Sequence, residues 1–323
     1  MDSIENTFSQ TRLLIDKVVK KNLTDGLLLS GGLDTSILAL VASKYSSLNA
    51  FTVAFKNTPA PDIEFSKLVA SRLDMDHKIH FFDEEEMFPA IQNVIKTLKV
   101  FDPMVVRNNA AIFVILRFAK ENSVKGVMTG DGLDELFAGY SWLFELSESK
   151  LNSKLSNMWQ LMEFPSIPLA RSLGMEAKTP YLDPEFKSFA MSIDSKLKIR
   201  SERGRIWGKW IIRKSFEGFL PDEIVWRAKT PNGSGTYMHA VFPKFFEAEI
   251  PNEYFKDKVK KYMRKDEVSI RDKEQLFYYE IFRFLFGPPI RIFSEAKGKL
   301  CPHCKSKVDE RSSFCRICGA YPI

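Results

Sequence analysis

With 323 residues, of which 45% are hydrophobic and 27% charged, the chain can form one large soluble domain or two. It has no apolar run near the roughly 20 residues of a membrane span, and its first residues lack the features of a secretory signal. We therefore expect a cytoplasmic protein that does not engage a membrane. The net charge of +6 is mild, and mixed basic and acidic residues favour a solvated surface over a nucleic-acid footprint.

The first elements in chain order are a helix, a strand, a glycine turn and a second helix. Residues 3–20 have amphipathic helical periodicity, and Leu27–Leu29 form an apolar run typical of a buried parallel strand. Gly31–Gly32 permit a sharp turn whose amides approach a ligand, and Asp34–Ser36 favour a helix start. A glycine turn that opens a helix N-terminus predicts a phosphate site. For the glycines alone, an ordinary strand-to-helix turn is the alternative.

The whole string Ser30–Ser36 resembles the pyrophosphate-binding loop, or PP-loop, of the N-type ATP pyrophosphatases. It is not a Walker A loop, because no Gly-Lys-Ser/Thr follows. The resemblance implies that ATP is cut between its α and β phosphates and that the loop holds the departing pyrophosphate. It implies the following ATP-binding residues: Leu29, Ser30, Gly31, Gly32, Asp34, Thr35 and Ser36.

Strands and helices alternate in the next part of the chain. Phe51–Phe55 and Lys78–Phe82 are predicted strands that flank a predicted helix at residues 63–73. This alternation predicts an α/β fold with a doubly wound parallel sheet and a ligand at the carboxyl ends of its strands. By analogy with related folds, Val53 is expected to line the adenine pocket. Residues 141–290 are mostly helical in pattern, so we expect a helical second half.

A second glycine loop follows a short strand at Gly126. It leads through Asp131 into a helix with two acids, Asp134 and Glu135, in its first turn. Asp34 and Asp134 each follow a glycine-containing loop at a strand end, so we expect them to share one Mg²⁺. Magnesium commonly binds through one or two carboxylates plus substrate phosphates. The alternative is a glycine-rich turn capped by acids.

Segments over roughly residues 10–287 resemble the synthetase domain of the glutamine-dependent asparagine synthetase family, which includes the β-lactam and carbapenam synthetases. The family signature Ser-Gly-Glu-Gly-x-Asp-Glu-x-Phe-x-Gly-Tyr stands here as Thr129–Tyr140. Further family segments match in the same order: Phe101–Pro103 with Arg107, Gly174–Asp183, Lys209–Arg213, Leu220–Lys229 and Lys273–Phe286. This ordered set is far more specific than any single motif.

The resemblance implies a two-step ligase. A substrate carboxylate attacks the α-phosphorus of ATP, pyrophosphate leaves with Mg²⁺, and a nitrogen nucleophile then displaces AMP from the acyl-adenylate. Thr129 and Gly130 then belong to the nucleotide site, and Lys229 matches the family lysine that stabilises charged intermediates; a surface lysine is the alternative for Lys229.

Asp131 stands where asparagine synthetases carry Glu and lactam-forming members carry Tyr. We expect it to take a proton from the attacking ammonium or amine, although the change leaves the nucleophile and acceptor open. The loop Pro231–Gly235 is expected to close over the site.

Two departures from the family pattern bear on the substrates. The first cysteine is Cys301, whereas the glutaminase domain of asparagine synthetases uses a terminal cysteine, so we do not expect glutamine hydrolysis by that chemistry. The expected nitrogen source is free ammonia, a separate amidotransferase subunit or an amine-bearing substrate. Pro165–Leu169 replaces the family's Arg-x-Asp-Lys segment. This departure is expected to alter acceptor recognition, so aspartate cannot be assumed; the expected acceptor is aspartate or a related carboxylate.

All four cysteines lie in the last 23 residues, in two Cys-x-x-Cys knuckles separated by ten residues: Cys301, Cys304, Cys315 and Cys318. This spacing resembles a zinc ribbon, and four thiolates suit a structural Zn²⁺ with no open position; a redox pair is the alternative. We expect the metal to fold the module, and the module to dock a protein partner, a carrier or RNA. The predicted boundaries are a synthetase domain at 1–289, a linker at 290–300 and a ribbon at 301–323.

The leading interpretation is an AMP- and pyrophosphate-forming amide ligase of the asparagine synthetase type. A PP-loop enzyme that adenylates a tRNA base is the main alternative, which the ribbon and the positive charge favour. The match at Thr129–Tyr140 and the segment Trp226–Lys229 argue against it. A nucleotide-binding scaffold without activity is the weakest interpretation, because Asp34, Asp134 and Lys229 are all present.

Overall fold

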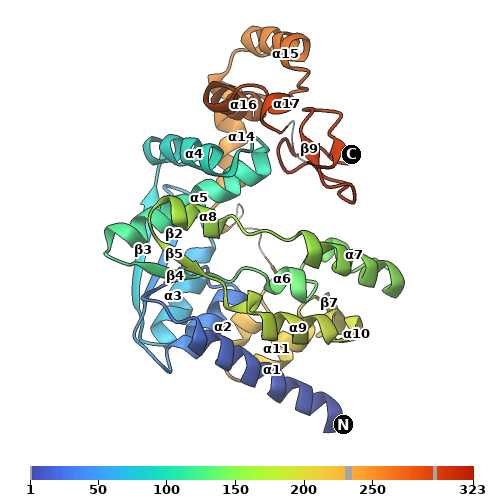
Figure 1. The fold of residues 1–323 in the computed structure, drawn as a ribbon. Helices are drawn as coiled ribbons and strands as arrows, with labels where there is room; N and C mark the ends of the chain where they lie inside the picture. Colours follow the sequence, from blue (N-terminus) through green and yellow to red (C-terminus); the bar gives the residue numbers. More distant parts are fainter. Residues whose placement is uncertain (1, 230–234, 294–296) are drawn as a thin grey trace. The chain divides into compact units, whose positions relative to one another are not determined.

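The computed structural model describes residues 2–229, 235–293 and 297–323 and contains a five-stranded parallel sheet in the order β3-β2-β1-β4-β5 (Figure 1). The strands are β1 (Gly26–Leu28), β2 (Asn49–Phe55), β3 (Asp76–Phe82), β4 (Gly126–Met128) and β5 (Glu176–Lys178). The central strand β1 pairs with β2 on one side and β4 on the other. The loops that follow β1 and β4 therefore leave neighbouring positions at the carboxyl edge of the sheet.

Helices occupy most of the remaining described chain. Up to β5 they are α1 (Asp2–Lys21), α2 (Leu33–Ala42), α3 (Asp62–Arg72), α4 (Glu84–Leu98), α5 (Pro103–Glu121), α6 (Leu133–Leu136), the 3-10 helix η1 (Ser141–Leu143), α7 (Glu148–Leu161) and α8 (Ser166–Ser172). After β5 the elements are η2 (Pro180–Leu182), α9 (Pro184–Ser192), α10 (Ser195–Lys198), β6 (Arg200–Glu202), β7 (Arg205–Trp207), α11 (Trp210–Phe216), α12 (Asp222–Val225), α14 (Met238–Glu249), α15 (Asn252–Asp266), α16 (Lys273–Phe286), α17 (Pro289–Ile292), β8 (Lys299–Leu300) and β9 (Lys307–Val308).

The chain forms two compact units. The first comprises the described residues of Met1–Val53, Pro61–His80 and Ile115–Pro231, and the second those of Ala54–Ala60, Phe81–Val114 and Asn232–Ile323. We refer to them as the first unit and the second unit.

Helix α1 covers one side of the first unit's core. Its predicted apolar face is buried: Ile15 and Val19 are 0% exposed and Val18 is 1% exposed. The helix packs on α2 and α11, and Figure 1 shows the three helices side by side. This burial explains why the helical periodicity of residues 3–20 was a reliable signal.

Aromatic side chains hold the second unit together around α16. The rings of Phe246 and Phe277 lie 4.8 Å apart between their centroids, and those of Phe101 and Tyr279 lie 4.9 Å apart. Helix α16 thereby contacts both α14 and the segment before α5. Aromatic pairs at these distances add favourable edge and offset contacts to the burial of their area.

The predicted doubly wound parallel α/β sheet with a helical second half is confirmed, and so are the predicted helices at 3–20 and 63–73. The fifth strand, β5, was missed because its three residues, Glu-Ala-Lys, are polar and too few to alternate; pairing with β4 makes them a strand. Helix α17 and strand β8 place short regular elements at both ends of the 290–300 stretch, whose role as a linker stays a prediction. Within the described residues, no helix is long and apolar enough to span a membrane.

Asp25 ties the start of β1 to the start of β4. Its Oδ2 accepts the Lys125 N–H and its Oδ1 accepts the Gly126 N–H, each at 2.9 Å. Burial alone would raise the pKa of Asp25, but the two backbone N–H donors outweigh it and hold the pKa below the ordinary value of 3.8. The carboxylate therefore stabilises the folded state above that value, and this contribution is lost as the pH falls through the lower folded pKa.

We predict that Asp25→Ala lowers the free energy of unfolding by about 0.5–1.5 kcal/mol at pH 7, because two backbone donors lose a charged acceptor, although water reaches this exposed position and replaces part of the loss. Urea denaturation measures this loss of stability. The difference between the variant and the parent should shrink below about pH 3, where Asp25 is protonated. The control is Glu5→Ala on the exposed part of α1, which is expected to leave the midpoint unchanged. Equal midpoints for Asp25→Ala and the control would contradict the role given to this carboxylate.

Candidate active site

The loop between β1 and α2 is closed by a threonine hydroxyl. Thr35 Oγ1 accepts the Ser30 N–H at 3.2 Å and lies 3.2 Å from Ser30 Oγ. Gly31 has a φ of +66°, and a Cβ there would lie 2.3 Å from the carbonyl carbon of Phe65, so glycine is required. The first α2 hydrogen bond runs from Ser36 N to Gly32 O at 3.0 Å, so the preceding amides stand at an open helix N-terminus. That geometry suits a phosphate.

Arg227 fastens this loop to helix α3. Its guanidinium donates to Ser30 O at 3.3 Å and to Asp62 Oδ1 at 2.8 Å, and it lies 3.9 Å from the centre of the Phe65 ring. Burial raises the pKa of Asp62, and the Arg227 cation opposes that effect. The loop is therefore supported from outside by a buried ion pair and a cation–π contact.

Four charged side chains form a cluster beside the loop: Asp34, Asp134, Lys209 and Lys229. Lys209 Nζ lies 2.7 Å from both carboxylate oxygens of Asp34. The same nitrogen lies 2.7 Å from Asp134 Oδ1, as an ion pair without hydrogen-bond geometry. Lys229 Nζ approaches Asp134 Oδ2 at 2.6 Å. Two carboxylates thus share one ammonium, and the second ammonium completes a formally neutral cluster.

The cluster is electrostatically uneven. Burial alone would raise the pKa of Asp134, but Lys209 and Lys229 outweigh it and lower the pKa to about 2. Asp34 has one close ammonium, and burial raises its pKa despite Lys209. Burial would lower the pKa of Lys209, but the two carboxylates raise it. Asp134 is therefore the carboxylate held most firmly in its charged form, and Lys209 stays an ammonium.

Backbone geometry brings Lys209 to the two aspartates. Lys209 precedes α11 with a φ of +55°, and its N–H donates to Phe137 O at 2.9 Å. A Cβ on Gly139 would lie 1.7 Å from Asp134 Oδ1 and 2.5 Å from Lys209 Cε. A Cβ on Gly208 would lie 2.1 Å from Ala138 O. The glycines are needed here because backbone and ion pair fill the space that a side chain would take.

Arg213 supports the segment that carries Lys229. It lies on α11, is 5% exposed, and donates through Nε to Gly208 O and through Nη1 to Arg227 O, each at 3.0 Å. Burial lowers the pKa of Arg213 to about 10. One side chain thus links the turn before Lys209 to the segment before Lys229.

Asp131 lies outside the lysine cluster, and two hydroxyl groups donate hydrogen bonds to it. Its Oδ2 accepts the Thr129 hydroxyl at 2.9 Å and the Ser166 hydroxyl at short range. Burial raises the pKa of Asp131, and these two hydrogen bonds oppose the rise. A carboxyl group with a raised pKa is suited to accept a proton.

Tyr140 lies under the ammonium of Lys229. Lys229 Nζ is 4.0 Å from the centre of the Tyr140 ring, and the Tyr140 hydroxyl donates to Glu135. The Trp159 indole N–H donates to Glu135 O at 2.9 Å. The aromatic ring and Asp134 together fix the end of a side chain that is otherwise 31% exposed.

The predicted nucleotide residues lie at the ends of the central strands. Leu29 and Val53 are buried after β1 and within β2, and Leu29 N donates to Phe51 O at 2.8 Å. Thr129 is buried after β4, and a Cβ on Gly130 would lie 3.0 Å from the Cβ of Asp34. The two glycine loops therefore touch. The predicted closing loop, Pro231–Gly235, lies outside the described residues except for its last glycine.

The structure thus brings together Asp34, Asp134 and Lys229, three of the predicted site residues, and places Asp131 among separate hydroxyl partners; the roles of all four stay predictions. The central residue Lys209 was not predicted as a site residue. A signal for it existed, because it opens one of the segments that resemble the family. Arg227, Arg213 and Ser166 were also missed, since nothing local in the sequence shows which side chains reach the loop.

The two aspartates fit the predicted Mg²⁺. Both carboxylates contact one cation in the structure, the ammonium of Lys209, and both lie beside the glycine loop between β1 and α2. Carboxylates that converge on one point and leave room for phosphate oxygens are the usual protein ligands of this metal.

The four cysteines are free thiols and form a second candidate site, in the second unit. They are 0–2% exposed, and their sulfur atoms all lie within 4.8 Å of one another. The sulfurs of Cys301 and Cys318 are 3.7 Å apart, as are those of Cys304 and Cys315. Four sulfurs at about 2.3 Å from a tetrahedral Zn²⁺ would lie about 3.8 Å from each other. The thiols therefore fit a closed zinc site.

The fold is a doubly wound parallel sheet with a glycine loop and a charged cluster at its strand ends, followed by a helical second half. The family model described as asparagine synthase matches residues 12–173 and 168–302. The chain therefore belongs to the asparagine synthase family.

Curated relatives carry the same family name. The chain is 30% identical over 297 residues to the glutamine-hydrolyzing asparagine synthetase of Zea mays, an alignment covering 83% of this chain and 49% of that protein. It is 33% identical over 245 residues to the enzyme of the same name from Sandersonia aurantiaca, covering 68% of this chain and 46% of that protein. The chain thus spans about half the length of the curated relatives it matches.

A solved structure of NH3-dependent NAD synthetase from Campylobacter jejuni is a more distant likeness. It matches with a TM-score of 0.31 and 16% identity, over 77% of this chain and 98% of that chain. At that score the likeness says nothing about function.

We predict that Gly139→Ala disrupts the charged cluster. The added Cβ cannot share the space of Asp134 Oδ1, so the carboxylate and Lys209 must separate. Isothermal titration with Mg-ATP should show at least about tenfold weaker binding, roughly the 1.4 kcal/mol of one displaced charge contact. The matched control is Gly174→Ala, which introduces backbone strain at a φ of +71° where nothing lies within 4 Å. Equal affinities in the two variants would contradict the crowding at Gly139.

Proposed function

We propose that this protein is an ATP-dependent amide-forming ligase. It adenylates a carboxylate, aspartate or a related acid, with release of pyrophosphate, and then transfers ammonia or an amine to the acyl-adenylate with release of AMP. The observation that carries the proposal is the cluster of Asp34, Asp134, Lys209 and Lys229 at the PP-loop of a chain that belongs to the asparagine synthase family.

In the first step the chain must hold a highly charged nucleotide and its leaving group. The open N-terminus of α2 and the loop amides from Ser30 to Ser36 offer N–H donors to the pyrophosphate. The ammoniums of Lys209 and Lys229 can turn toward phosphate oxygens, because the carboxylates that hold them can instead be neutralised by a second cation. Fixed donors of this kind need little reorganisation as charge develops, which is the usual source of a large rate effect.

Asp34 and Asp134 would hold the magnesium ion. When bound, Mg²⁺ supplies charge neutralisation at the departing pyrophosphate. Asp134 is suited to this role because its pKa of about 2 keeps it ionised at all working pH values. The adenine base would lie near Leu29 and Val53, with Thr129 and Gly130 at the neighbouring loop.

In the second step a nitrogen nucleophile must lose a proton. Asp131 is our candidate for this role, because burial raises its pKa and its carboxylate is hydrogen-bonded by the Thr129 and Ser166 hydroxyls. Lys229, fixed by Asp134 and the ring of Tyr140, would stabilise the negative charge that develops at the acyl group and phosphate. We propose Asp131 and Lys229 as the two catalytic residues.

The surroundings of Asp131 bear on the choice of acceptor and nitrogen source. Ser166 lies in the segment that departs from the family pattern, and its hydroxyl reaches Asp131. We propose that this segment sets the choice of carboxylate and amine. Ammonia, either free or from a separate amidotransferase subunit, or an amine substrate would supply nitrogen, and the reaction would take place in the cytoplasm.

The test is pyrophosphate release from Mg-ATP with a panel of carboxylates, aspartate first, with and without ammonia, beside a parallel series with bulk tRNA. Release that needs a carboxylate, yields AMP and disappears in Asp34→Ala supports the ligase. Release that needs tRNA alone would overturn the ligase in favour of base adenylation.

We predict that Lys209→Met lowers the rate of pyrophosphate release by more than about 100-fold. Removing the ammonium from the buried cluster leaves the carboxylates of Asp34 and Asp134 close together without the cation between them. Arg264→Met, on the exposed face of α15, is the matched control and should keep full activity. Circular dichroism checks that both variants fold. Activity within threefold or so of the parent would remove Lys209 from the site.

We predict that Asp131→Asn separates the two steps. Carboxylate-dependent exchange of labelled pyrophosphate into ATP should persist, whereas amide formation should fall by about 10²- to 10⁴-fold, the usual contribution of a general base. In the parent, amide formation should decline as the pH falls through a pKa above the ordinary value of 3.8, because only ionised Asp131 accepts the proton. Equal loss of both steps would assign Asp131 to the first step instead.

A further inference from the structure

The cysteine ribbon is hydrogen-bonded to the rest of the second unit through the backbone of both knuckles. In the first knuckle, His303 O accepts the Ser269 N–H at 2.8 Å. In the second knuckle, Ile317 O accepts the Phe101 N–H at 2.7 Å. Ser269 and Phe101 each stand a few residues before a long helix, α16 and α5 respectively.

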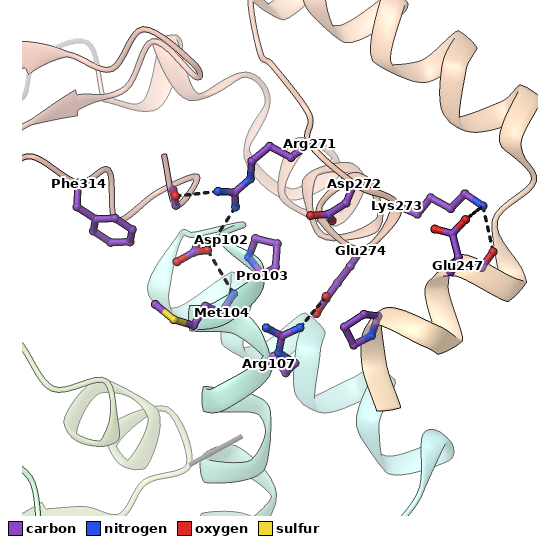
Figure 2. A pocket seen from close by; sticks show the side chains of 12 residues that line it. Asp102, Pro103, Met104, Arg107, Glu247, Arg271, Asp272, Lys273, Glu274 and Phe314 are labelled. Atoms are coloured by element: carbon purple, nitrogen blue, oxygen red, sulfur yellow. Dashed lines mark hydrogen bonds and ion pairs between the residues drawn. The ribbon is translucent and has the colours of Figure 1, made fainter. Parts of the chain in front are cut away.

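Side chains add further contacts to the second knuckle. Gln275 Nε2 donates to Cys318 O at 2.7 Å, and Arg271 Nη1 donates to Gly319 O at 2.8 Å. Arg271 also lies 3.7 Å from Asp102 Oδ1, and Figure 2 shows its guanidinium reaching toward that carboxylate. A Cβ on Gly319, whose φ is +77°, would lie 2.2 Å from Asp102 Oδ1. The knuckle backbone therefore fits against Asp102 with no room for a side chain.

These contacts converge on the first turns of α5 and α16. Asp102 caps α5 by accepting the Met104 N–H at 3.2 Å, and Gln275 accepts the Arg271 N–H at 2.8 Å at the start of α16. Arg107 on α5 and Glu274 on α16 are joined at 2.9 Å. A cavity of about 450 Å³ lies among these residues, Pro243, Glu247 and Phe314 (Figure 2).

We propose that the four cysteines bind one Zn²⁺ and that the loaded ribbon is a clamp holding the starts of α5 and α16 together. The carbonyls of residues 303 and 317–319 point at their partners because each knuckle loop wraps the sulfur cluster, with matching bonds from Lys305 N to Cys301 O and from Gly319 N to Cys315 O. So short a module has almost no apolar core, so its loop shape depends on the metal. Without metal the four carbonyls lose their positions, and the two helix starts lose a shared partner.

Hydrogen exchange at two amides tests the clamp directly. The full chain is purified, its zinc content is measured, and exchange at the Phe101 and Ser269 amides is followed before and after removal of metal with a chelator. We expect one Zn²⁺ per chain and an exchange rate at both amides that rises about tenfold or more on removal, since their acceptors are ribbon carbonyls. Amides within α2 are the internal reference and should change less than about twofold.

Two variants keep the test decisive if metal removal unfolds the second unit. Arg271→Ala should retain one Zn²⁺ yet speed exchange at Phe101, because it loosens the ribbon without touching a thiol; Arg264→Ala on α15 is the matched control. Unchanged exchange at Phe101 and Ser269 after complete metal loss would overturn the clamp. Cysteines recovered as disulfides with no bound zinc would overturn the metal site in favour of a redox pair. Neither outcome depends on whether the ligase activity is found.

Discussion

The candidate active site depends on one buried ammonium placed between two carboxylates. Two aspartates this close would repel each other strongly in a partly dehydrated site, and Lys209 removes that repulsion with contacts of 2.7 Å to each. Much of the nearby backbone serves this contact. The absence of a side chain at Gly139 leaves room for the ion pair. The left-handed backbone of Lys209, just before α11, directs its side chain to the aspartates, and Arg213 hydrogen-bonds to the turn before Lys209.

The sequence predicted those features of the fold and the site that depend on residues close together in the chain. The glycine loop, the two aspartates that follow strand ends and the apolar face of α1 were all predicted, because their residue types are dictated by turn geometry or periodicity. Lys209, Ser166 and Arg227 reach the site from distant parts of the chain. The family-like segments include Lys209 and Arg227, but no local pattern shows which side chains these residues contact. Strand β5 was missed for a related reason: its partner β4, not its own three residues, makes it a strand.

The contacts of the cysteine ribbon likewise could not be predicted from the sequence. Its cysteine spacing indicates a self-contained module, and the sequence alone suggests an appendage for a partner. In the structure its knuckle carbonyls at 317–319 are already used by Phe101, Arg271 and Gln275 within the second unit. Cysteine spacing reveals which residues can bind a metal, but only the fold reveals which groups the knuckle loops contact.

The contact between Ser166 and Asp131 separates two kinds of change that the protein can undergo. The loop between β1 and α2 and the cluster of Asp34, Asp134, Lys209 and Lys229 are carried by β1, α2, the β4 loop, the turn before α11 and the stretch after α12. Ser166, by contrast, begins α8, which packs on the edge strand β5. A change in α8 can therefore alter the polarity around Asp131 without altering a residue of that cluster. If Asp131 takes the proton as we propose, sequence changes in α8 would alter the amide-forming step and leave the proposed nucleotide site unchanged.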